Sequence, residues 1–523
     1  LLTLEEENNP LELLFNLGKT ISNEFAKSYL VDSKYVRSHD EGSIFIHDLD
    51  YYVLGATFST HLDLSFINDY DYYFESILKH LLCIKEEQCG EHSLTSIDYL
   101  FIFWLVASFK KIFKSNLFKY LELEGFLNYL NTLKLQEMID KLDNIYFDID
   151  IFKEFISSNK VKEIFNIAYN NSLKEIEELL KTKLKTLLKS LNEYDHKIKK
   201  DSNYIISLGS NKSNMGIFIT KVYLEVIKEL EGLENVTTVY KITNGKDLLL
   251  EDVSKLVTLG KNISFNYLNK SNVEYFSDGK RIWENVIDKK ETSMGRSIIS
   301  KVSINLVRIA LESKNINEFY HNLDTMLEFA KNELLQAFEY LSSKYKKNYK
   351  YSFNEFITDE DKKIRKVIKS GTLDIGYSGL NEAIYILSNK NDVDIGDFKI
   401  ATDIVKFMKF KSDKFIKEYK LNFTVFETVD KDVLSYFENI DKSIYGDVIK
   451  NKYEPFYKIF NKSKIKLEDC LKIETKIAKY SNGGYYEVIN IPKNSSYKKV
   501  LEIINMAKEY ELGYFKIIVG RLE

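Results

Sequence analysis

Histidines and aspartates gather near the amino end of the chain, where their types could support metal binding or proton transfer. His47 and Asp48 are followed by His61 and Asp63, so these four residues fall within 17 positions. Imidazole nitrogens and carboxylate oxygens are zinc ligands and can also act as general acids or bases. The spacing matches no established metal motif. We therefore favour the other interpretation, in which these groups hold a loop by hydrogen bonding.

Cysteine thiols could carry redox or metal chemistry, but the chain has only Cys83, Cys89 and Cys470. None of them belongs to a CxxC pair, so neither a tetrahedral zinc site nor a disulfide framework is expected. We place Cys83 and Cys89 on one helix and Cys470 just before a helical run. All three are expected to be buried structural thiols.

Motifs of other enzyme classes do not occur. The segment 209–213, Gly-Ser-Asn-Lys-Ser, has the residue types of a phosphate-binding loop. It lacks the GxxxxGK[ST] spacing with which backbone amides hold a phosphate, so we expect it to open the helix that follows. GxSxG, HExxH and the protein-kinase motifs are missing as well.

Long helices and short strands must position these residues. Apolar residues three or four positions apart between Phe319 and Leu341 predict one face of a long helix. Runs rich in β-branched and aromatic residues predict strands at 43–46, 204–208, 421–426 and 485–491. Residues 122–200 have helical periodicity and almost no glycine, which predicts a helical excursion between two halves. Strands separated by long helices favour an α/β fold.

Composition excludes several classes of partner. The formal net charge is -4, and Lys and Arg form no cluster of the kind that binds nucleic acid. No apolar run approaches the roughly 20 residues that span a bilayer, so no membrane partner is expected. The acidic start lacks the residue order of a signal peptide. We therefore expect a cytoplasmic protein.

Five groups of motifs occur in a fixed order along almost the whole chain. They lie at 38–64, 88–93, 295–308, 371–383 and 482–515, and include His47-Asp48-Leu49-Asp50-Tyr51 and the GTLDIGYSGLNEA run. In this order they resemble the HDLDY and NCxLDL, QxGGQS, GRGN…TINLPR, GTLxIGFxGLxEA and late-chain motifs of the anaerobic, glycyl-radical ribonucleoside-triphosphate reductases. The resemblance covers residues 1–523 as a single reductase-like domain.

The resemblance implies a ten-stranded α/β barrel made of two antiparallel-arranged halves, with a helical coat and a central finger loop. In the family, the tip of this loop presents a cysteine that forms a thiyl radical. A second thiol, in the NCxLDL stretch, supplies reducing equivalents to the ribose. Oxygen cannot replace sulfur in this redox chemistry.

The residues of this chain depart from that pattern at three positions. Asp278 stands where the resemblance implies the radical cysteine, Thr60 where it implies the second cysteine, and Ile298 where the family has an asparagine. We expect Asp278 to be largely buried and to face Thr60. A buried carboxylate is costly unless it is paired, and Lys280 and Arg281 are the nearest cations in sequence.

Other family positions keep polar residues that could serve a retained pocket or the structure. These are His47, Asp48, His61, Asp63, Arg296 and Asn305. We expect no catalytic residue, no metal and no cofactor. The zinc ribbon, the glycyl-radical loop and the ATP-cone of the family are expected to be absent, and Gly520 lacks the sequence context of a radical glycine.

Three functions remain open at this point. The first is a catalytically inactive relative that is retained for binding a nucleotide or a partner. That partner would be a second copy of the chain or an intact reductase subunit. The second is ribonucleotide reduction with the radical glycine supplied by another polypeptide. The third is a decaying paralogue with no selected role.

Overall fold

The computed structural model describes residues 10–198, 203–268, 273–282, 285–286, 289, 293–344, 364–388, 398–446, 452–453 and 466–520. Within these ranges eleven strands form the centre of the molecule. They are β1 (Ile44–Ile46), β2 (Thr60–Leu62), β3 (His92–Leu94), β4 (Tyr204–Leu208), β5 (Val236–Ile242), β6 (Ile263–Tyr267), β7 (Ile298–Asn305), β8 (Thr372–Ser378), β9 (Asn422–Glu427), β10 (Glu487–Ile491) and β11 (Tyr514–Val519).

The strands form two parallel halves. β2 to β6 pair in chain order as one parallel set, and β7, β8 and β9 pair as another. β10 and β11 are parallel to each other and continue the second half. Parallel neighbours need long crossovers, and helices supply them here: α9 joins β4 to β5, and α12 lies between β7 and β8.

The two halves meet in antiparallel seams that turn the sheets into a barrel. One seam pairs β11 with β6. The other joins residues 58–61 to residues 295–298, through bonds such as Phe58 N–H to the Ile298 carbonyl at 3.0 Å. Between β9 and β10 the Gly483 N–H donates to the Val425 carbonyl at 2.8 Å. The expected ten-stranded α/β barrel is therefore confirmed, with β1 added beside β7.

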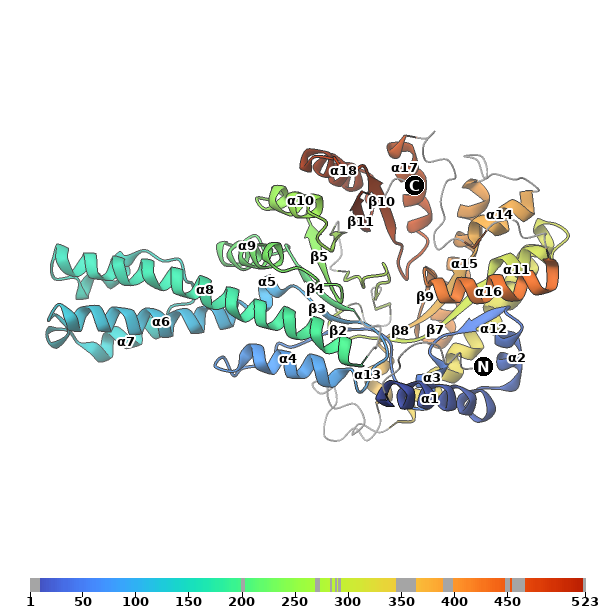
Figure 1. The fold of residues 1–523 in the computed structure, drawn as a ribbon, viewed down its shortest axis with the longest axis horizontal. Helices are drawn as coiled ribbons and strands as arrows, with labels where there is room; N and C mark the ends of the chain where they lie inside the picture. The colour runs from blue at the N-terminus through green and yellow to red at the C-terminus, as the bar shows by residue number, and fades with distance from the viewer. Residues whose placement is uncertain are drawn as a thin grey trace.

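Helices surround the barrel (Figure 1). They are α1 (Pro10–Phe25), η1 (Ala26–Leu30), α2 (Ser33–Asp40), α3 (Leu49–Tyr52), α4 (Tyr73–Ile84), α5 (Ile97–Leu100), α6 (Ile102–Leu123), η2 (Leu127–Tyr129), α7 (Thr132–Asp140), η3 (Ile149–Phe155), α8 (Asn159–Ile198), α9 (Asn214–Glu229), α10 (Leu250–Thr258), α11 (Leu306–Leu311), α12 (Ile316–Ser342), α13 (Arg365–Ile368), α14 (Leu380–Ser388), α15 (Phe398–Tyr419), α16 (Lys431–Tyr445), α17 (Leu467–Ala478) and α18 (Tyr497–Glu509).

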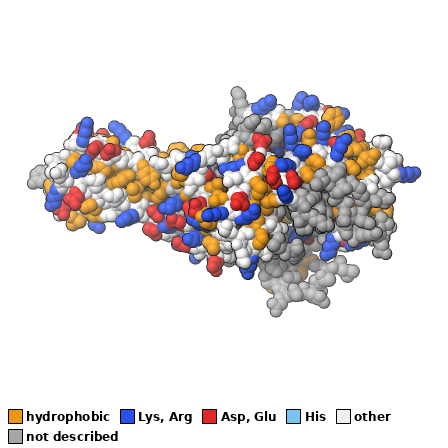
Figure 2. Space-filling view, turned by 90° about the horizontal axis from the view of Figure 1, so that it is seen from above, with side chains coloured by type: hydrophobic (Ala, Val, Ile, Leu, Met, Phe, Trp, Pro, Cys, Tyr) orange, Lys and Arg blue, Asp and Glu red, His pale blue; other side chains and the backbone are white. Residues whose placement is uncertain are grey.

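A helical arm projects from the first half of the barrel, between β3 and β4. It consists of α6, α7 and the 40-residue α8, at the left of Figure 1. Its buried side includes Phe109, Phe113 and Phe165. The arm therefore lies within the first half and not between two halves as expected. It begins at Ile102, earlier than the predicted start at about 122, because the apolar period of α6 extends back to the barrel. Hydrophobic side chains also reach the surface along the arm (Figure 2).

Several predicted elements are confirmed. The helix predicted from the 319–341 periodicity is α12, and the predicted strands are β1, β4, β9 and β10. Strand β10 starts two residues late, at Glu487, because Gly483 and Gly484 instead contact β9 and the finger loop. Within the described ranges, no helix combines the length and the apolar character needed to cross a bilayer.

The finger loop enters the barrel between β6 and β7. Its described residues, 273–282, pack with residues of five barrel strands or their flanks, including Phe58, Ile205, Val239, Ile298 and Tyr514. Gly279 forms the turn with φ +78°, and Lys280 forms a bridge with Gly484. The inner core of the barrel is thus built partly from the loop itself.

This close approach predicts that Gly484 cannot carry a side chain. An added Cβ would overlap the Gly279 carbonyl oxygen, and φ is +129°, which only glycine adopts easily. We expect Gly484→Ala to destabilise the fold by about 2–4 kcal/mol, measured from unfolding midpoints in urea. Gly232→Ala is the control, because φ is +68° there and no atom lies within 4 Å of the added Cβ. Equal losses in the two variants would contradict the tight contact.

Candidate functional site

Aromatic rings hold the finger loop inside the barrel. The ring of His61 on β2 stacks on Phe276 with centroids 4.1 Å apart and an interplanar angle of 4°. On the other side Tyr275 stacks on Tyr514 at 5.0 Å. Burial lowers the pKa of His61 to about 3. His61 is therefore neutral near pH 7 and acts as a flat packing surface for the loop.

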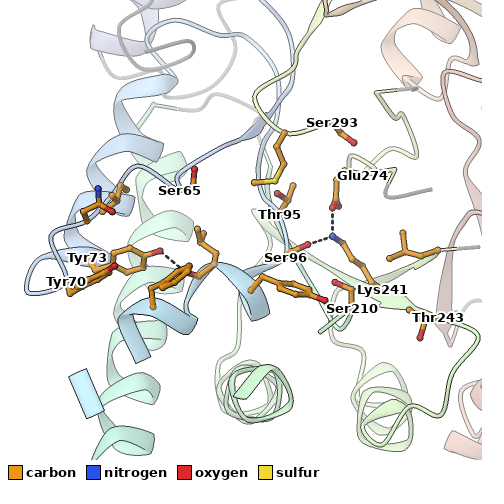
Figure 3. A pocket seen from close by; sticks show the side chains of 17 residues that line it. Ser65, Tyr70, Tyr73, Thr95, Ser96, Ser210, Lys241, Thr243, Glu274 and Ser293 are labelled. Carbon is orange, nitrogen blue, oxygen red and sulfur yellow. Dashed lines mark hydrogen bonds and ion pairs between the residues drawn. The ribbon is translucent and has the colours of Figure 1, made fainter. Parts of the chain in front are cut away.

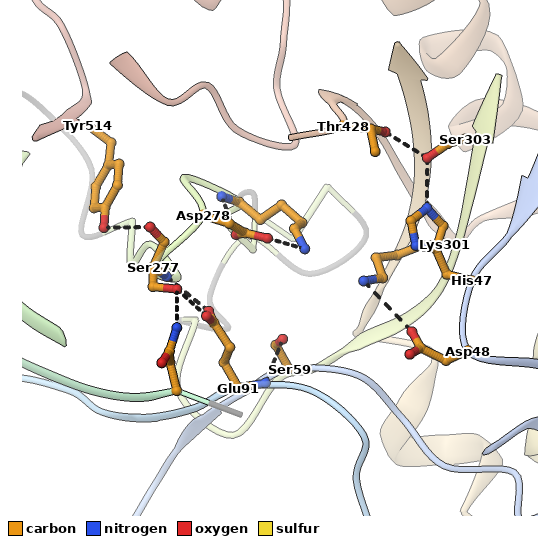
Figure 4. Close-up of polar contacts among 12 residues, drawn as sticks. His47, Asp48, Ser59, Glu91, Ser277, Asp278, Lys301, Ser303, Thr428 and Tyr514 are labelled. Carbon is orange, nitrogen blue, oxygen red and sulfur yellow. Dashed lines mark hydrogen bonds and ion pairs between the residues drawn. The ribbon is translucent and has the colours of Figure 1, made fainter. Parts of the chain in front are cut away.

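A carboxylate fixes the backbone of the loop. Glu91, just before β3, accepts the Ser277 N–H at 2.9 Å and also bonds the Ser277 hydroxyl (Figure 4). Burial raises the pKa of Glu91 to about 7, and the nearby Asp278 adds to the rise. Sequence reasoning did not identify Glu91, because its partner lies 186 positions away.

Asp278 at the tip of the loop is paired rather than isolated. Its carboxylate forms an ion pair with the Lys280 ammonium and accepts the Lys280 N–H at 3.1 Å. The Asp278 side chain is 25% exposed and that of Lys280 is 13% exposed. Asp278 is therefore about three-quarters buried, and Lys280, one of the two cations expected to pair with it, forms the ion pair.

Polar groups on the second half of the barrel face the loop. Lys301 on β7 lies 3.9 Å from Asp48, and burial with the nearby Lys280 lowers the pKa of Lys301. Asp374 on β8 is fully buried, accepts a hydrogen bond from Thr424, and has its pKa raised by burial to about 7.

His47 belongs to the same wall of the barrel. Its Nε2 lies 2.7 Å from the Ser303 hydroxyl, which in turn is 2.6 Å from the Thr428 hydroxyl. Burial lowers the pKa of His47 well below its usual value, so the ring is neutral. Beside it, a cavity of about 30 Å³ is lined by His47, Asp48 and Cys89, among others. Such a space holds about one water molecule.

Thr60 and Asp278 have different hydrogen-bond partners in the described part of the chain. The Thr60 hydroxyl is 2.5 Å from that of Ser297 and accepts a bond from Gln88 at 2.6 Å. Successive side chains of a strand point to opposite faces. Because His61 points at the finger loop, Thr60 points away from it. Ile298, in contrast, packs in the same inner cluster as Phe276.

The remaining predicted positions have structural contacts. The Arg296 guanidinium donates to the Ser370 carbonyl at 2.7 Å, and Asp63 accepts the Ser65 N–H at 3.0 Å. The Asn305 side chain caps α11 and donates to Asp441 at 2.8 Å. Across the described part of the chain, no group of three or more His, Cys, Asp or Glu side chains could hold a metal ion.

The cysteines lie apart from one another. Cys83 is on α4 and Cys470 is buried on α17. The placement of Cys89 on a helix was wrong: α4 ends at Ile84, and Cys89 pairs with Thr57 through its N–H at 3.0 Å. Gly90 explains this, because a Cβ there would overlap the Phe58 backbone, and only glycine lets the two segments meet.

A pocket of about 970 Å³ opens at the carboxyl ends of the parallel strands β2 to β6 (Figure 3). Aromatic side chains line one end, including Tyr70, Tyr73, Tyr99 and Phe103. Its other end carries hydroxyl groups and the ion pair of Lys241 with Glu274. Ligands of α/β proteins commonly bind beyond the carboxyl ends of parallel strands.

A groove of about 710 Å³ continues from this pocket along α6, and Tyr70 and Phe103 line both. Lys110, Lys114 and Lys141 line the groove. Among the described residues none of these three lysines forms an ion pair, and Lys110 donates only to the Asp140 carbonyl at 2.6 Å. The groove therefore places ammonium groups beside an aromatic pocket, and Asp140 and Asp143 also line it.

Comparisons with known proteins agree on one family. The family model described as anaerobic ribonucleoside-triphosphate reductase matches residues 217–519, more than half of the chain. The anaerobic ribonucleoside-triphosphate reductase of Haemophilus influenzae is 28% identical over 217 residues, which cover 38% of this chain. The match spans only 30% of that relative's length.

Solved structures show the same fold. The anaerobic ribonucleotide reductase from Thermotoga maritima in complex with dATP and CTP has a TM-score of 0.66 at 12% identity, covering 97% of this chain and 84% of that one. The same enzyme with dATP bound in the specificity site gives 0.64 at 12% identity, covering 97% and 83%. At this identity the likeness shows the barrel fold alone.

The ion pair at the loop tip predicts a cost when its acid is neutralised. Asp278→Asn removes the carboxylate that pairs directly with the Lys280 ammonium, and we expect a loss of about 1–3 kcal/mol in unfolding free energy. Combining Asp278→Asn with Lys280→Met should recover most of the loss. A single variant as stable as the parent in urea unfolding would show that the pair does not hold the loop.

The buried Asp374 predicts a pH dependence of stability. Its folded pKa of about 7 exceeds the ordinary value of 3.8, so the carboxyl contributes most below pH 4, and stability is lost as the pH rises to 7. Asp374→Asn should therefore match the parent at pH 4 and exceed its stability at pH 8. Asp403→Asn, at an exposed site on α15, should show no such difference in thermal unfolding across this range.

Proposed function

The chain belongs to the anaerobic ribonucleoside-triphosphate reductase family, and from this premise we propose that it binds a nucleoside triphosphate without reducing it. The observation that carries the proposal is the residue at the tip of the finger loop, Asp278, which is ion-paired to Lys280. A carboxylate held in this way cannot form a thiyl radical or return a hydrogen atom to a ribose. The radical step of the family therefore has no starting group in this chain.

The position of the family's second cysteine, in the NCxLDL stretch, supports the same proposal. Thr60 occupies it in sequence, and its hydroxyl is bonded to Ser297 and Gln88 on the side away from the loop. Cys89 is near the loop, but it packs at the edge of the inner apolar cluster. Reduction with a radical glycine from another polypeptide would still need both thiols, so we do not favour it.

The pocket and the groove support the binding part of the proposal. Aromatic side chains suit a nucleobase or ribose, and the lysines of α6 suit a polyphosphate, whose charge they would balance. The two sites share Tyr70 and Phe103, so one ligand can reach both. Anaerobic ribonucleotide reductase of Thermotoga maritima binds dATP and CTP, which agrees with a nucleotide as the ligand.

A binding and turnover assay tests the proposal. We expect a nucleoside triphosphate to bind in isothermal titration calorimetry, with affinity that falls as salt increases, and no deoxynucleotide to form under anaerobic reducing conditions with an activating enzyme. Lys110→Ala combined with Lys114→Ala should weaken binding at least tenfold, because two phosphate contacts are removed.

Lys119→Ala is the matched control, since Lys119 is exposed on the same helix and does not line the groove. It should bind the nucleotide like the parent. Formation of a deoxynucleotide would refute the loss of catalysis. Absence of binding by every nucleoside triphosphate would refute the binding role.

A further inference from the structure

Two opposite charges lie together at the inner end of the pocket. Lys241 on β5 is 2% exposed and Glu274, at the base of the finger loop, is 6% exposed, yet both line the pocket. Their ion pair is shown in Figure 3. Because the pair is neutral overall, it suits an uncharged group with both donors and acceptors better than it suits a phosphate.

The Lys241–Glu274 ion pair does not use all of its hydrogen-bond donors and acceptors. The Lys241 ammonium has three donors and uses two, on Glu274 and on the Ser96 hydroxyl at 2.6 Å. The Glu274 carboxylate has about four acceptor sites and uses two, for Lys241 and for Ser207 at 3.3 Å. Counted over the described residues alone, one donor and two acceptor sites have no partner, and both side chains line the pocket.

Ser96 holds this arrangement in place. It adopts a left-handed conformation, with φ +51°, directly between β3 and α5. Its N–H donates to Ser207 at 2.9 Å, and its hydroxyl accepts from Lys241. A non-glycine residue in this conformation is strained and persists where its surroundings fix it. The ends of the Lys241 and Glu274 side chains are thus oriented before any ligand arrives.

We propose that Lys241 and Glu274 recognise guanine, so that the nucleotide of this site is a guanine nucleotide. The O6 atom of guanine accepts a hydrogen bond, while N1–H and the N2 amino group donate. O6 would take the free donor of Lys241, and N1–H and N2–H would fill the two free acceptor sites of Glu274. This inference rests on the proposed nucleotide binding and adds the identity of the base.

Other bases satisfy the pair less completely. Hypoxanthine lacks the second donor of guanine, so it leaves one Glu274 site empty, and uracil places its O2 acceptor against that site. Adenine and cytosine offer their donor and acceptor in the opposite order along the edge. A site built around hydrogen bonds discriminates strongly against ligands that lack one, because buried polar groups are then left unpaired.

Titration calorimetry of the full chain with GTP, ITP, ATP, UTP and CTP tests the inference. We expect GTP to bind at least tenfold more tightly than ITP, which lacks the N2 amino group, and at least tenfold more tightly than ATP. Glu274→Gln should weaken GTP binding at least tenfold and change ATP binding less than twofold. Glu418→Gln, at an exposed site on α15, is the matched control and should leave all affinities unchanged.

If Glu274→Gln does not fold, the parent protein alone tests guanine recognition, because the ratio of its GTP and ITP affinities needs no variant. Affinities within threefold of one another for all five nucleotides would overturn guanine recognition and leave the proposed function standing. Tighter binding of ATP than of GTP would overturn it as well. If none of the five binds, both the inference and the proposed function fail.

Discussion

The packing of the finger loop inside the barrel is the contact on which the rest of the structure depends. His61 from β2 and Tyr514 from β11 clamp it between the two halves. The close approach of Gly279 and Gly484 lets the loop pair with the residues just before β10, which also pair with β9. The loop thus supplies part of the inner core of the barrel with its own side chains, and its base carries Glu274 into the pocket.

Much of the fold could be predicted from the sequence, because its signals are local. The apolar period of α12 and the β-branched runs of β4 and β9 identify a helix and strands from neighbouring residues alone. The prediction that the strands close into a barrel came from the ordered motifs that resemble the reductase family. Local patterns alone leave the pairing of β2 with residues 295–298 undetermined, because that pairing joins segments 237 positions apart.

The site was harder to predict, for a physical reason that Thr60 illustrates. Alignment gives its position but not the direction of its side chain, which depends on the neighbouring His61 facing Phe276. Glu91, Lys301 and Asp374 were missed because their partners lie on other strands. One feature of the sequence does point to the pocket. Lys241 lies on β5 on the same face as the inward-facing Val239, and a charged residue at such a position marks a candidate site.

The helical arm has a consequence for the order in which the chain folds. The contacts of α6 with α8 join residues such as Asn116 and Ser172, which are 56 positions apart and so closer in sequence than the two sides of the barrel seam. The seam between β2 and β7 joins residues 237 positions apart, so closing it costs more loop entropy. The arm can therefore form as an independent cooperative unit, and local opening of the barrel seam need not unfold it.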